Sequence, residues 1–461
     1  MRVSEIARRG AYYGVLAATR RGAIIRIGQF IRSHYFAPKT HIEQIVRNRI
    51  AKLLRHCLYN VPYYRNLFAQ KGLSEKQIQA DPIAALSSLP LLTKSHIRQH
   101  FQQIQSVDLP KRRWYYNTSG GSTGEPVRFV QDHDYFCWSM AQKYVFETIA
   151  RQPIGRSRIV VWGSERDILG EGTTRWTKIG RWLRNDWVIN AFRITAADVD
   201  LFLRLNKMGV QNVIGYTSSL EEIAQHLLRR DTKACFDSII CTAGTLYPEA
   251  RRKIEQLLGG EVFNYYGSRE VGAIACECAL HQGLHISPFT VFIEIVDESG
   301  CPMPSGVPGE IVVTSLINYA FPLIRYKIGD VGIISDTPCS CGCSWPMLRE
   351  VRGRTTDMFV AQDGSRIDGE FFTHLVYFVD WILKFRFVQE SYELVRLEIV
   401  PSIGTTNVQE QAVNLQRDLE PKIQAVLGSQ AHLELVIVNE ITPTASGKHR
   451  YTVSRVLEGT R

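Results

Sequence analysis

Residues 118–129, TSGGSTGEPVRF, combine three glycines with several hydroxyl side chains. A loop that binds phosphate needs small residues, so that backbone N–H groups can approach the anion, and hydroxyl donors beside them. The stretch is not the GxxxxGK[ST] loop of P-loop proteins, because it lacks the required lysine. Taken alone, such a stretch is more often an ordinary surface connection, so its interpretation depends on the segments that follow it.

Two other short segments are rich in side chains that bind metals. ACECALHQGLH at 275–285 and PCSCGCSWP at 338–346 together contain five cysteines and two histidines. Tetrahedral zinc takes four thiolate or imidazole ligands, and a Cys-x-Cys turn with glycine is a suitable half-site. The two segments are more than fifty residues apart, so they must meet in the fold to share an ion. Packed free thiols are the alternative.

The elements that must position these segments follow an alternating pattern. Apolar runs that read as strands alternate with amphipathic helices, which predicts an α/β sheet that is at least partly parallel; the strands are 158–163, 212–216, 236–244 and 261–267, and the helices between them include 218–230 and 247–259. From about residue 289, two alternating strands flank a Gly/Pro-rich turn, which predicts a β-rich subdomain. Residues 357–461 read as a compact α+β unit.

Five motifs occur in order: TSGGSTGEP (118–126), NYYGSREVG (264–272), LIRYKIGDVG (323–332), VRGRTTDMF (351–359) and ITPTASGKHR (441–450). Together they resemble the core motifs of the adenylate-forming superfamily. Within it, the chain is most similar to the phenylacetate–CoA ligase family, particularly relatives from capsular and exopolysaccharide loci. The resemblance extends from about residue 40 to near the C-terminus.

The resemblance implies a fold, a division into domains and a reaction. The expected fold is a large N-terminal α/β domain with a β-rich subdomain, followed by a small mobile α+β domain. The expected boundaries are a basic arm at 1–36, a large domain at 37–355 and a small domain at 356–461. A carboxylic acid would attack the α-phosphate of ATP to give acyl-AMP, and coenzyme A would then displace AMP.

The resemblance also implies roles for individual residues. The phosphate loop would bind the β- and γ-phosphates through Ser119, Gly121, Ser122, Thr123 and Gly124. The adenine would lie between two segments that contain Ala243 and Gly244, and Tyr266 and Gly267. Asp330 would bind the ribose, Arg354 the phosphate or ribose, and Glu270 a Mg²⁺ ion. Lys448 would reach the site from the small domain and stabilise charge during adenylation, with Glu270 and Thr123 as the other catalytic residues.

Some family members have a Cys/His site, and its positions map to Cys278, His285, Cys339 and Cys341. Cys276, His281 and Cys343 are competing ligands, and four protein ligands predict a structural zinc. The chain departs from the family pattern at Arg269 (usually Thr), Glu125 (usually Lys) and Thr356 (usually Asp). Candidate residues of the acyl pocket are Trp138, Tyr216, Thr217, Ser218, Tyr247 and Tyr265. They do not identify the acid, and an amine or hydroxyl acceptor in envelope polysaccharide synthesis stays open beside coenzyme A.

Charge and composition bear on the partners. The net charge is +10, but residues 1–36 contain seven arginines and one glutamate, so the rest of the chain carries only +4. A zinc-stabilised nucleic-acid-binding protein is the alternative to an enzyme, and this charge distribution disfavours it. The arm is predicted to be a helix packed on the body, with an interfacial helix on anionic lipid as the alternative. Ten cysteines without a signal peptide predict a cytoplasmic location, with peripheral membrane contact if the arm binds lipid. The oligomeric state is open, a dimer included.

Overall fold

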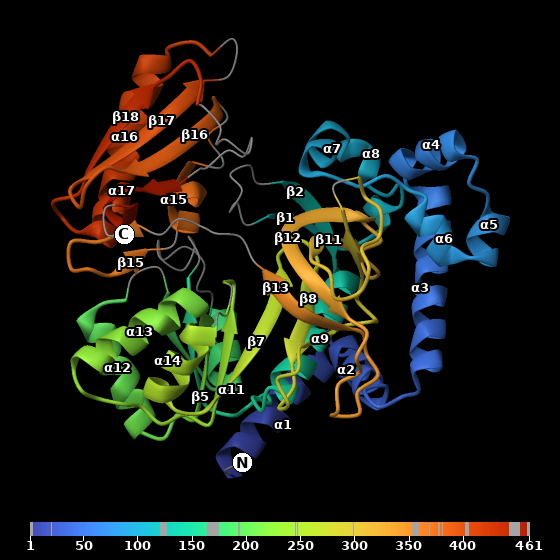
Figure 1. Ribbon diagram of the computed structural model, residues 1–461, viewed down its shortest axis with the longest axis horizontal. Helices are drawn as coiled ribbons and strands as arrows, with labels where there is room; N and C mark the ends of the chain where they lie inside the picture. The colour runs from blue at the N-terminus through green and yellow to red at the C-terminus, as the bar shows by residue number, and fades with distance from the viewer. Residues whose placement is uncertain are drawn as a thin grey trace.

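The protein is described by a computed structural model (Figure 1). It describes residues 3–19, 21–119, 127–163, 175–191, 194–244, 246, 248–297, 299–352, 359–367, 369–376, 379, 381–401, 405–441 and 452–458. No helix among these residues is long and apolar enough to cross a membrane.

The first hundred residues are helical: α1 (Val3–Ala18), α2 (Ala23–Ser33), α3 (Lys39–Asn60), α4 (Pro62–Lys71), α5 (Glu75–Ala80), α6 (Pro82–Ser87), α7 (Lys94–Gln99) and α8 (Phe101–Ile104). Short polar residues begin the later helices by accepting bonds from free backbone N–H groups. Asp81 accepts from the first turn of α6, and Thr93 forms a reciprocal capping box with His96 at α7. Thr93 is thus the N-cap of α7.

A hairpin of β1 (Trp114–Thr118) and β2 (Arg128–Asp132) follows, and leads into α9 (His133–Ile149). The next part alternates strands and helices: β3 (Arg158–Trp162), α11 (Arg175–Arg184), β4 (Asp186–Asn190), α12 (Ala196–Lys207), β5 (Asn212–Tyr216), α13 (Thr217–Arg229), β6 (Ser238–Thr242), α14 (Pro248–Leu258) and β7 (Glu261–Ser268). Strands β3 to β7 pair in parallel, which confirms the prediction from the alternating pattern.

Antiparallel strands continue the chain: β8 (Gly272–Glu277), β9 (Leu284–Ile286), β10 (Val291–Val296), β11 (Gly309–Ser315), β12 (Tyr326–Ser335) and β13 (Met347–Arg352). The order across the sheet is β10-β11-β12-β13-β9-β8-β7-β6-β5-β3-β4, eleven strands in all. The β-rich part predicted from residue 289 is thus not a separate sheet. Strand β7 joins the two halves, because it pairs in parallel with β6 on one side and antiparallel with β8 on the other.

The C-terminal elements form their own small sheet and core. They are β14 (Phe359–Val360), β15 (Arg366–Ile367), α15 (Gly369–Val376), β16 (Ile382–Gln389), β17 (Leu394–Pro401), α16 (Val408–Leu427), β18 (His432–Ile437), β19 (Thr452–Ser454) and α17 (Arg455–Glu458). The four-stranded sheet has the order β18-β17-β16-β19, and its buried side chains form one cluster. The boundary predicted at 355/356 lies outside the described residues, so the division into domains stays a prediction.

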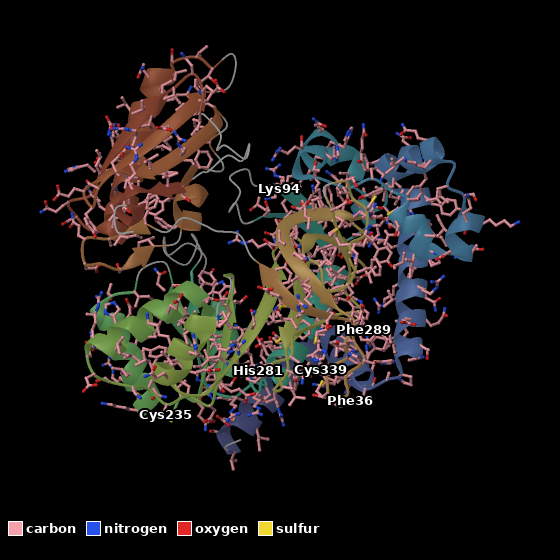
Figure 2. All side chains as sticks on the ribbon, viewed as in Figure 1. Phe36, Lys94, Cys235, His281, Phe289 and Cys339 are labelled. Carbon is pink, nitrogen blue, oxygen red and sulfur yellow. The ribbon has the colours of Figure 1, made fainter. Side chains whose placement is uncertain are left out.

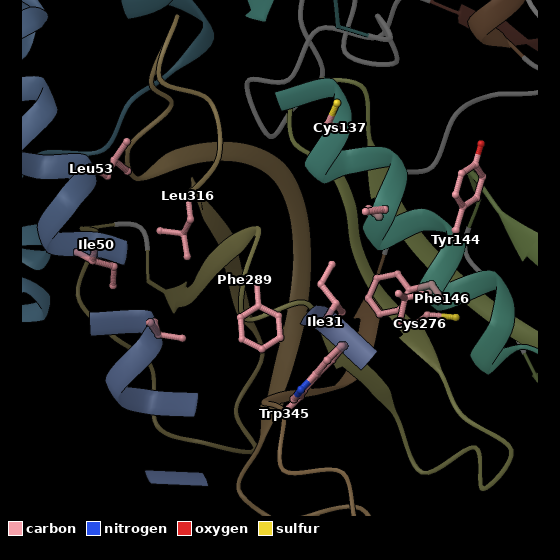
Figure 3. Packing of buried hydrophobic residues seen from close by; sticks show 14 of the residues in the cluster. Ile31, Ile50, Leu53, Cys137, Tyr144, Phe146, Cys276, Phe289, Leu316 and Trp345 are labelled. Carbon is pink, nitrogen blue, oxygen red and sulfur yellow. The ribbon is translucent and has the colours of Figure 1, made fainter. Parts of the chain in front are cut away.

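The largest core cluster includes the N-terminal arm. Tyr12, Leu16, Ile24 and Ile31 of α1 and α2 are buried in it. Figure 3 shows Ile31 beside Trp345, with Phe289 close to both. The apolar positions of the arm therefore pack on the body, as the packed-helix interpretation predicted, and the lipid alternative gains no support from these four residues.

Candidate active site and metal centre

Several predicted site residues lie where parallel strands end. In open α/β sheets, ligands bind beyond the carboxyl ends of the strands. Strand β5 ends at Tyr216, and the Thr217 hydroxyl donates to the Gly244 carbonyl oxygen beyond β6 at 3.3 Å. Ala243 has the left-handed φ of 60°, which is uncommon for a residue with a side chain. The loops after β5 and β6 therefore support each other at this edge, and Ala243 and Gly244 are exposed there.

Two tyrosine–carboxylate pairs join β7 to β12. The Tyr266 hydroxyl donates to Asp330 Oδ2 at 2.7 Å, and the Tyr326 hydroxyl donates to Glu270 Oε1 at 3.2 Å. Each of the two segments supplies one tyrosine and one carboxylate. Three strands, β8, β9 and β13, separate β7 from β12 in the sheet, so the sheet must curve strongly for these side chains to meet. The curvature brings the predicted Mg²⁺ ligand and the predicted ribose ligand to the same side of the molecule.

The phosphate loop is closed at its base by a hairpin. Ser119 N donates to the Val127 carbonyl oxygen at 2.9 Å, and Val127 N donates to Ser119 Oγ at 2.8 Å. Ser119 is fully buried, so its hydroxyl holds the loop base together. The hydroxyl oxygen acts only as an acceptor in this bond, so direct phosphate binding would use its O–H as the donor. Gly121, Ser122, Thr123 and Gly124 lie outside the described residues.

Gln131 connects this hairpin to the segment that carries Glu270. Its Oε1 accepts from Asn117 Nδ2 at 3.0 Å, and its Nε2 donates to the carbonyl oxygens of Arg269 at 2.9 Å and Glu270 at 3.4 Å. Its side chain is almost completely buried. The β1–β2 hairpin and the turn after β7 are therefore held in a fixed relation by one side chain.

The turn after β7 is packed too closely for side chains at two glycines. A Cβ at Gly267 would lie 2.8 Å from the Gly272 carbonyl oxygen, which is backbone and cannot move aside cheaply. Gly272 has φ +80°, and a Cβ there would lie 2.4 Å from Ser139 Oγ on α9. Gly267 was predicted to lie near the nucleotide, and the close packing is a second reason why this position requires glycine.

Sequence reasoning missed Gln131 and Tyr326. Tyr326 lies in the motif LIRYKIGDVG, which also contains Asp330, so the motif could have indicated that Tyr326 belongs to the site. Gln131 carries no such signal, because an isolated glutamine in an apolar strand is not a motif. Two predicted residues, Arg354 and Lys448, lie outside the described residues.

The residues proposed for the acyl pocket fall into different clusters. Trp138 lies in the core beside α2, where the Arg49 guanidinium group is 4.1 Å from the centroid of the Trp138 ring. Tyr216 instead packs on Trp162, with ring centroids 4.8 Å apart, and donates to the Gly163 carbonyl oxygen. Tyr265 packs against Phe146 in the main core. Tyr247 and the side chain of Ser218 are outside the described part. Of the described residues, Tyr216 and Thr217 are the ones at the strand ends.

Four predicted metal ligands come together. The ligand atoms of Cys278, His285, Cys339 and Cys341 all lie within 4.8 Å of one another. Cys278 Sγ and Cys339 Sγ are 3.7 Å apart, and Cys341 Sγ and His285 Nε2 are 3.5 Å apart. Tetrahedral zinc with ordinary bond lengths places two sulfurs about 3.8 Å apart and a sulfur and a nitrogen about 3.6 Å apart. These two distances therefore match the edges of a tetrahedral zinc site.

The competing ligands are engaged elsewhere. Cys276 is buried in the main core and donates to a backbone carbonyl oxygen, while His281 contacts Glu277 and Glu261, each at 3.1 Å. Cys343 lies outside the four-residue group but donates its backbone N–H to Cys341 Sγ at 3.4 Å. Burial raises the pKa of Cys278 to about 12 and lowers the pKa of His285 to about 4. In the absence of a cation, burial thus favours a neutral thiol and a neutral imidazole.

Aromatic residues of the arm enclose this cluster. The Tyr35 ring lies 6.0 Å from the His285 ring and 5.2 Å from the Trp345 ring, both edge to face. Trp345 Nε1 donates to the His34 carbonyl oxygen at 3.1 Å. Figure 2 places Cys339 near Phe36, the residue after Tyr35. The cluster therefore lies between the sheet and the end of α2.

Known proteins share both the sequence and the fold. The CapK C-terminal domain family matches residues 359–455. The chain is 33% identical over 364 residues to the phenylacetate-coenzyme A ligase of Pseudomonas putida, covering 75% of this chain and 76% of that protein. It is 23% identical over 425 residues to Protein CapK of Staphylococcus aureus, covering 90% and 89%.

A solved structure of 2-hydroxyisobutyryl-CoA ligase, in complex with 2-HIB-AMP and CoA, has a TM-score of 0.58 at 18% identity, covering 92% of each chain. This likeness confirms the fold expected from the motifs. The identity and coverage shared with the Pseudomonas putida enzyme settle the family: this chain belongs to the phenylacetate–coenzyme A ligase family.

Proposed function

We propose that the protein is an ATP-dependent, AMP-forming ligase that activates an organic acid as acyl-AMP and transfers the acyl group to coenzyme A. In the first step, a carboxylate oxygen of the acid attacks the α-phosphorus of ATP, and pyrophosphate leaves. In the second step, the thiolate sulfur of coenzyme A attacks the acyl carbon, and AMP leaves. Both steps depend on positioning and on stabilising negative charge.

The pairs Tyr266–Asp330 and Tyr326–Glu270 are the observation that carries this proposal. They hold two carboxylates in fixed positions beside the hairpin that closes the phosphate loop, and Gln131 ties that hairpin to the Glu270 segment. A nucleotide offers matching groups, because its ribose hydroxyls donate to a carboxylate and its phosphates require a cation. The geometry thus supports a site for one nucleotide.

The proposed roles follow from this arrangement. Asp330 accepts from the ribose hydroxyls, in exchange for the Tyr266 hydroxyl or together with it. Glu270 would hold Mg²⁺, which neutralises phosphate charge when bound, and Tyr326 keeps its carboxylate oriented. The β- and γ-phosphates accept hydrogen bonds from Ser119, Gly121, Ser122, Thr123 and Gly124. Lys448 brings a positive charge from the small domain during adenylation, and Arg354 contacts phosphate or ribose.

The test is acid-dependent release of pyrophosphate from ATP across a panel of aryl and alkyl acids, with and without coenzyme A. Release with AMP formation that depends on coenzyme A supports the proposal, and no release with any acid contradicts it.

Lys448→Ala should depress adenylation at least a hundredfold, a loss of about 3 kcal/mol or more, because the charge that Lys448 stabilises develops in the first step. The variant should spare thioester formation from supplied acyl-AMP. The matched control is Lys422→Ala on α16, whose partner Asp418 is one turn away on the surface. Equal loss in both half-reactions would contradict the role of Lys448.

A second candidate keeps the adenylation step and changes the acceptor to an amine or hydroxyl group in envelope polysaccharide synthesis. The match of the small domain to the CapK C-terminal domain family favours it, because that domain would face the acceptor in the second step. Acid-dependent pyrophosphate release that coenzyme A does not affect would favour this candidate over the first.

We also propose that Cys278, His285, Cys339 and Cys341 bind one structural zinc ion. The four ligands leave no open position for a substrate. The ion would fasten the segment after β8 to the loop between β12 and β13. Metal analysis should find about one zinc per chain, and Cys339→Ser with Cys341→Ser should remove it and lower the unfolding temperature. The control is Cys301→Ser, an exposed cysteine outside the cluster. A folded protein that contains no metal would contradict the proposal.

A further inference from the structure

The outward side of the N-terminal arm differs from its packed side. The exposed residues of α1 are all small or apolar except Ser4, and among them Val3, Ile6 and Val15 are large and exposed. Soluble helices normally place charged and polar residues on the outward side. The outward side of α1 is therefore an apolar helix face without a partner among the described residues.

Helix α11 extends this face. The guanidinium group of Arg8 lies 4.5 Å from the ring centroid of Trp182, and also donates to the Trp182 carbonyl oxygen, so the two helices are in contact. Trp182 is 61% exposed and Ile179, one turn earlier, is 46% exposed. Strand β4, at the edge of the sheet after α11, exposes Trp187 and Val188. We call the exposed apolar residues of α1, α11 and β4 the α1–α11 surface.

The charges around the α1–α11 surface are of one sign. Residues 3–19 and 175–191 contain six basic residues and two acids, Glu5 and Asp186. Both acidic side chains are buried. Glu5 accepts from the backbone N–H of Ser157, and Asp186 pairs with Arg158 and Arg184. Solvent thus meets cations here, among them the exposed Lys178, and no exposed carboxylate of these two described segments.

We propose that the α1–α11 surface binds the surface of an anionic lipid membrane. Exposed tryptophans with aliphatic residues, flanked by Arg and Lys, match the boundary between acyl chains and acidic headgroups. A second copy of the chain fits less well, because a two-fold contact would place these cations against each other. A nucleic acid would satisfy the cations but not the aliphatic side chains.

The surface lies at the end of the molecule away from the small domain. Figure 1 shows α1 and α11 at the lower end and the strands β16 to β18 at the upper end. A membrane at the α1–α11 surface would thus leave the carboxyl ends of the parallel strands facing water, so that ATP and its acid can enter. The contact differs from the one expected from the arm alone, since it requires α11 and β4.

The experiment is flotation of the full chain with vesicles of phosphatidylcholine, with and without phosphatidylglycerol. We expect binding that requires phosphatidylglycerol and weakens with salt. Trp182→Ala and Lys178→Glu should each weaken it roughly tenfold. The matched controls, Tyr392→Ala on the small domain and Lys233→Glu after α13, should bind like the unaltered chain. Pyrophosphate release in solution, or an unfolding curve if no acid is active, checks that the variants are folded.

Each other outcome overturns the proposal. No flotation with either vesicle, or equal flotation of Trp182→Ala and the unaltered chain, excludes this surface as a lipid site. Self-association without lipid that Trp182→Ala abolishes, measured by light scattering, identifies a second copy as the occupant. Binding of single-stranded RNA without flotation identifies a nucleic acid instead.

Discussion

Gln131→Met tests whether one side chain couples the phosphate hairpin to the segment that carries Glu270. Methionine has about the length and volume of glutamine, so the substitution leaves little cavity and removes mainly the hydrogen bonds. It deletes the acceptor for Asn117 and the donor to the carbonyl oxygens of Arg269 and Glu270. The Glu270 carbonyl oxygen keeps a second donor, the Tyr135 hydroxyl at 3.4 Å.

The expected loss follows from these groups. The Arg269 carbonyl oxygen loses its donor, at about 1–3 kcal/mol for a buried unsatisfied acceptor, and the Asn117 amide loses a bond of about 1 kcal/mol. The free energy of unfolding should thus fall by about 2–4 kcal/mol. A carboxylate displaced by about 1 Å costs on the order of a hundredfold in rate, so kcat/KM for MgATP should fall by roughly 10- to 100-fold.

Two measurements check this prediction: urea denaturation for stability, and initial rates of pyrophosphate release over a range of MgATP concentrations. The control is Gln411→Met, which removes a surface bond to the Thr406 carbonyl oxygen that water replaces, so its cost should stay within about 0.5 kcal/mol. If Gln131→Met lowers stability as expected but leaves kcat/KM for MgATP at the level of Gln411→Met, the side chain is structural only and the coupling is refuted.

Two further predictions concern a hydroxyl group and a carboxyl group. Tyr326→Phe should raise the Mg²⁺ concentration needed for half-maximal pyrophosphate release by roughly tenfold, since Glu270 loses a charge-assisted bond of about 1.5–3 kcal/mol; an unchanged Mg²⁺ titration would contradict it. Hydrogen bonding with Arg112 lowers the pKa of Asp108 to about 2 from 3.8, so its contribution to stability is present above about pH 4 and is lost as the pH falls toward 2. Because the Asp108 side chain is 31% exposed and solvent screens the pair, we discount this contribution to about 1 kcal/mol, and urea denaturation of Asp108→Asn should show a gap from the unaltered chain that narrows over this range.

The sequence predicted the local elements well where the period of apolar residues was clear. The parallel strands β3, β5, β6 and β7 and the helices α13 and α14 lie where the alternating pattern placed them. Strand β4 was missed, because DWVIN is a short edge strand with exposed apolar residues and follows a polar helix. An edge strand packs on one neighbour only, so its sequence carries a weaker signal than a central strand.

The candidate site was predicted in part, and the missing part depends on curvature. Motif resemblance placed Glu270 and Asp330 at one nucleotide, but no local pattern shows that Tyr266 and Tyr326 would pair with them across three intervening strands. That contact depends on how far the whole sheet bends, which is set by the sum of many strand pairs. The set of four Cys/His ligands came from the family resemblance, because residue types alone left Cys276, His281 and Cys343 as competing ligands.

The role of the arm could not be read from its charge. Seven arginines in residues 1–36 suggest a separate basic segment, yet the residues at the end of α2 hold the Cys/His loop. Trp345 donates to the His34 carbonyl oxygen, and the Ser344 hydroxyl donates to the Ala37 carbonyl oxygen. In α2, Arg26 and Arg32 are exposed while Ile24 and Ile31 enter the main core, so in this helix the charge describes the surface and the spacing describes the packing. It follows that the Cys/His cluster and the arm stabilise each other, because loosening either one exposes the apolar contacts of Tyr35 and Trp345 to water.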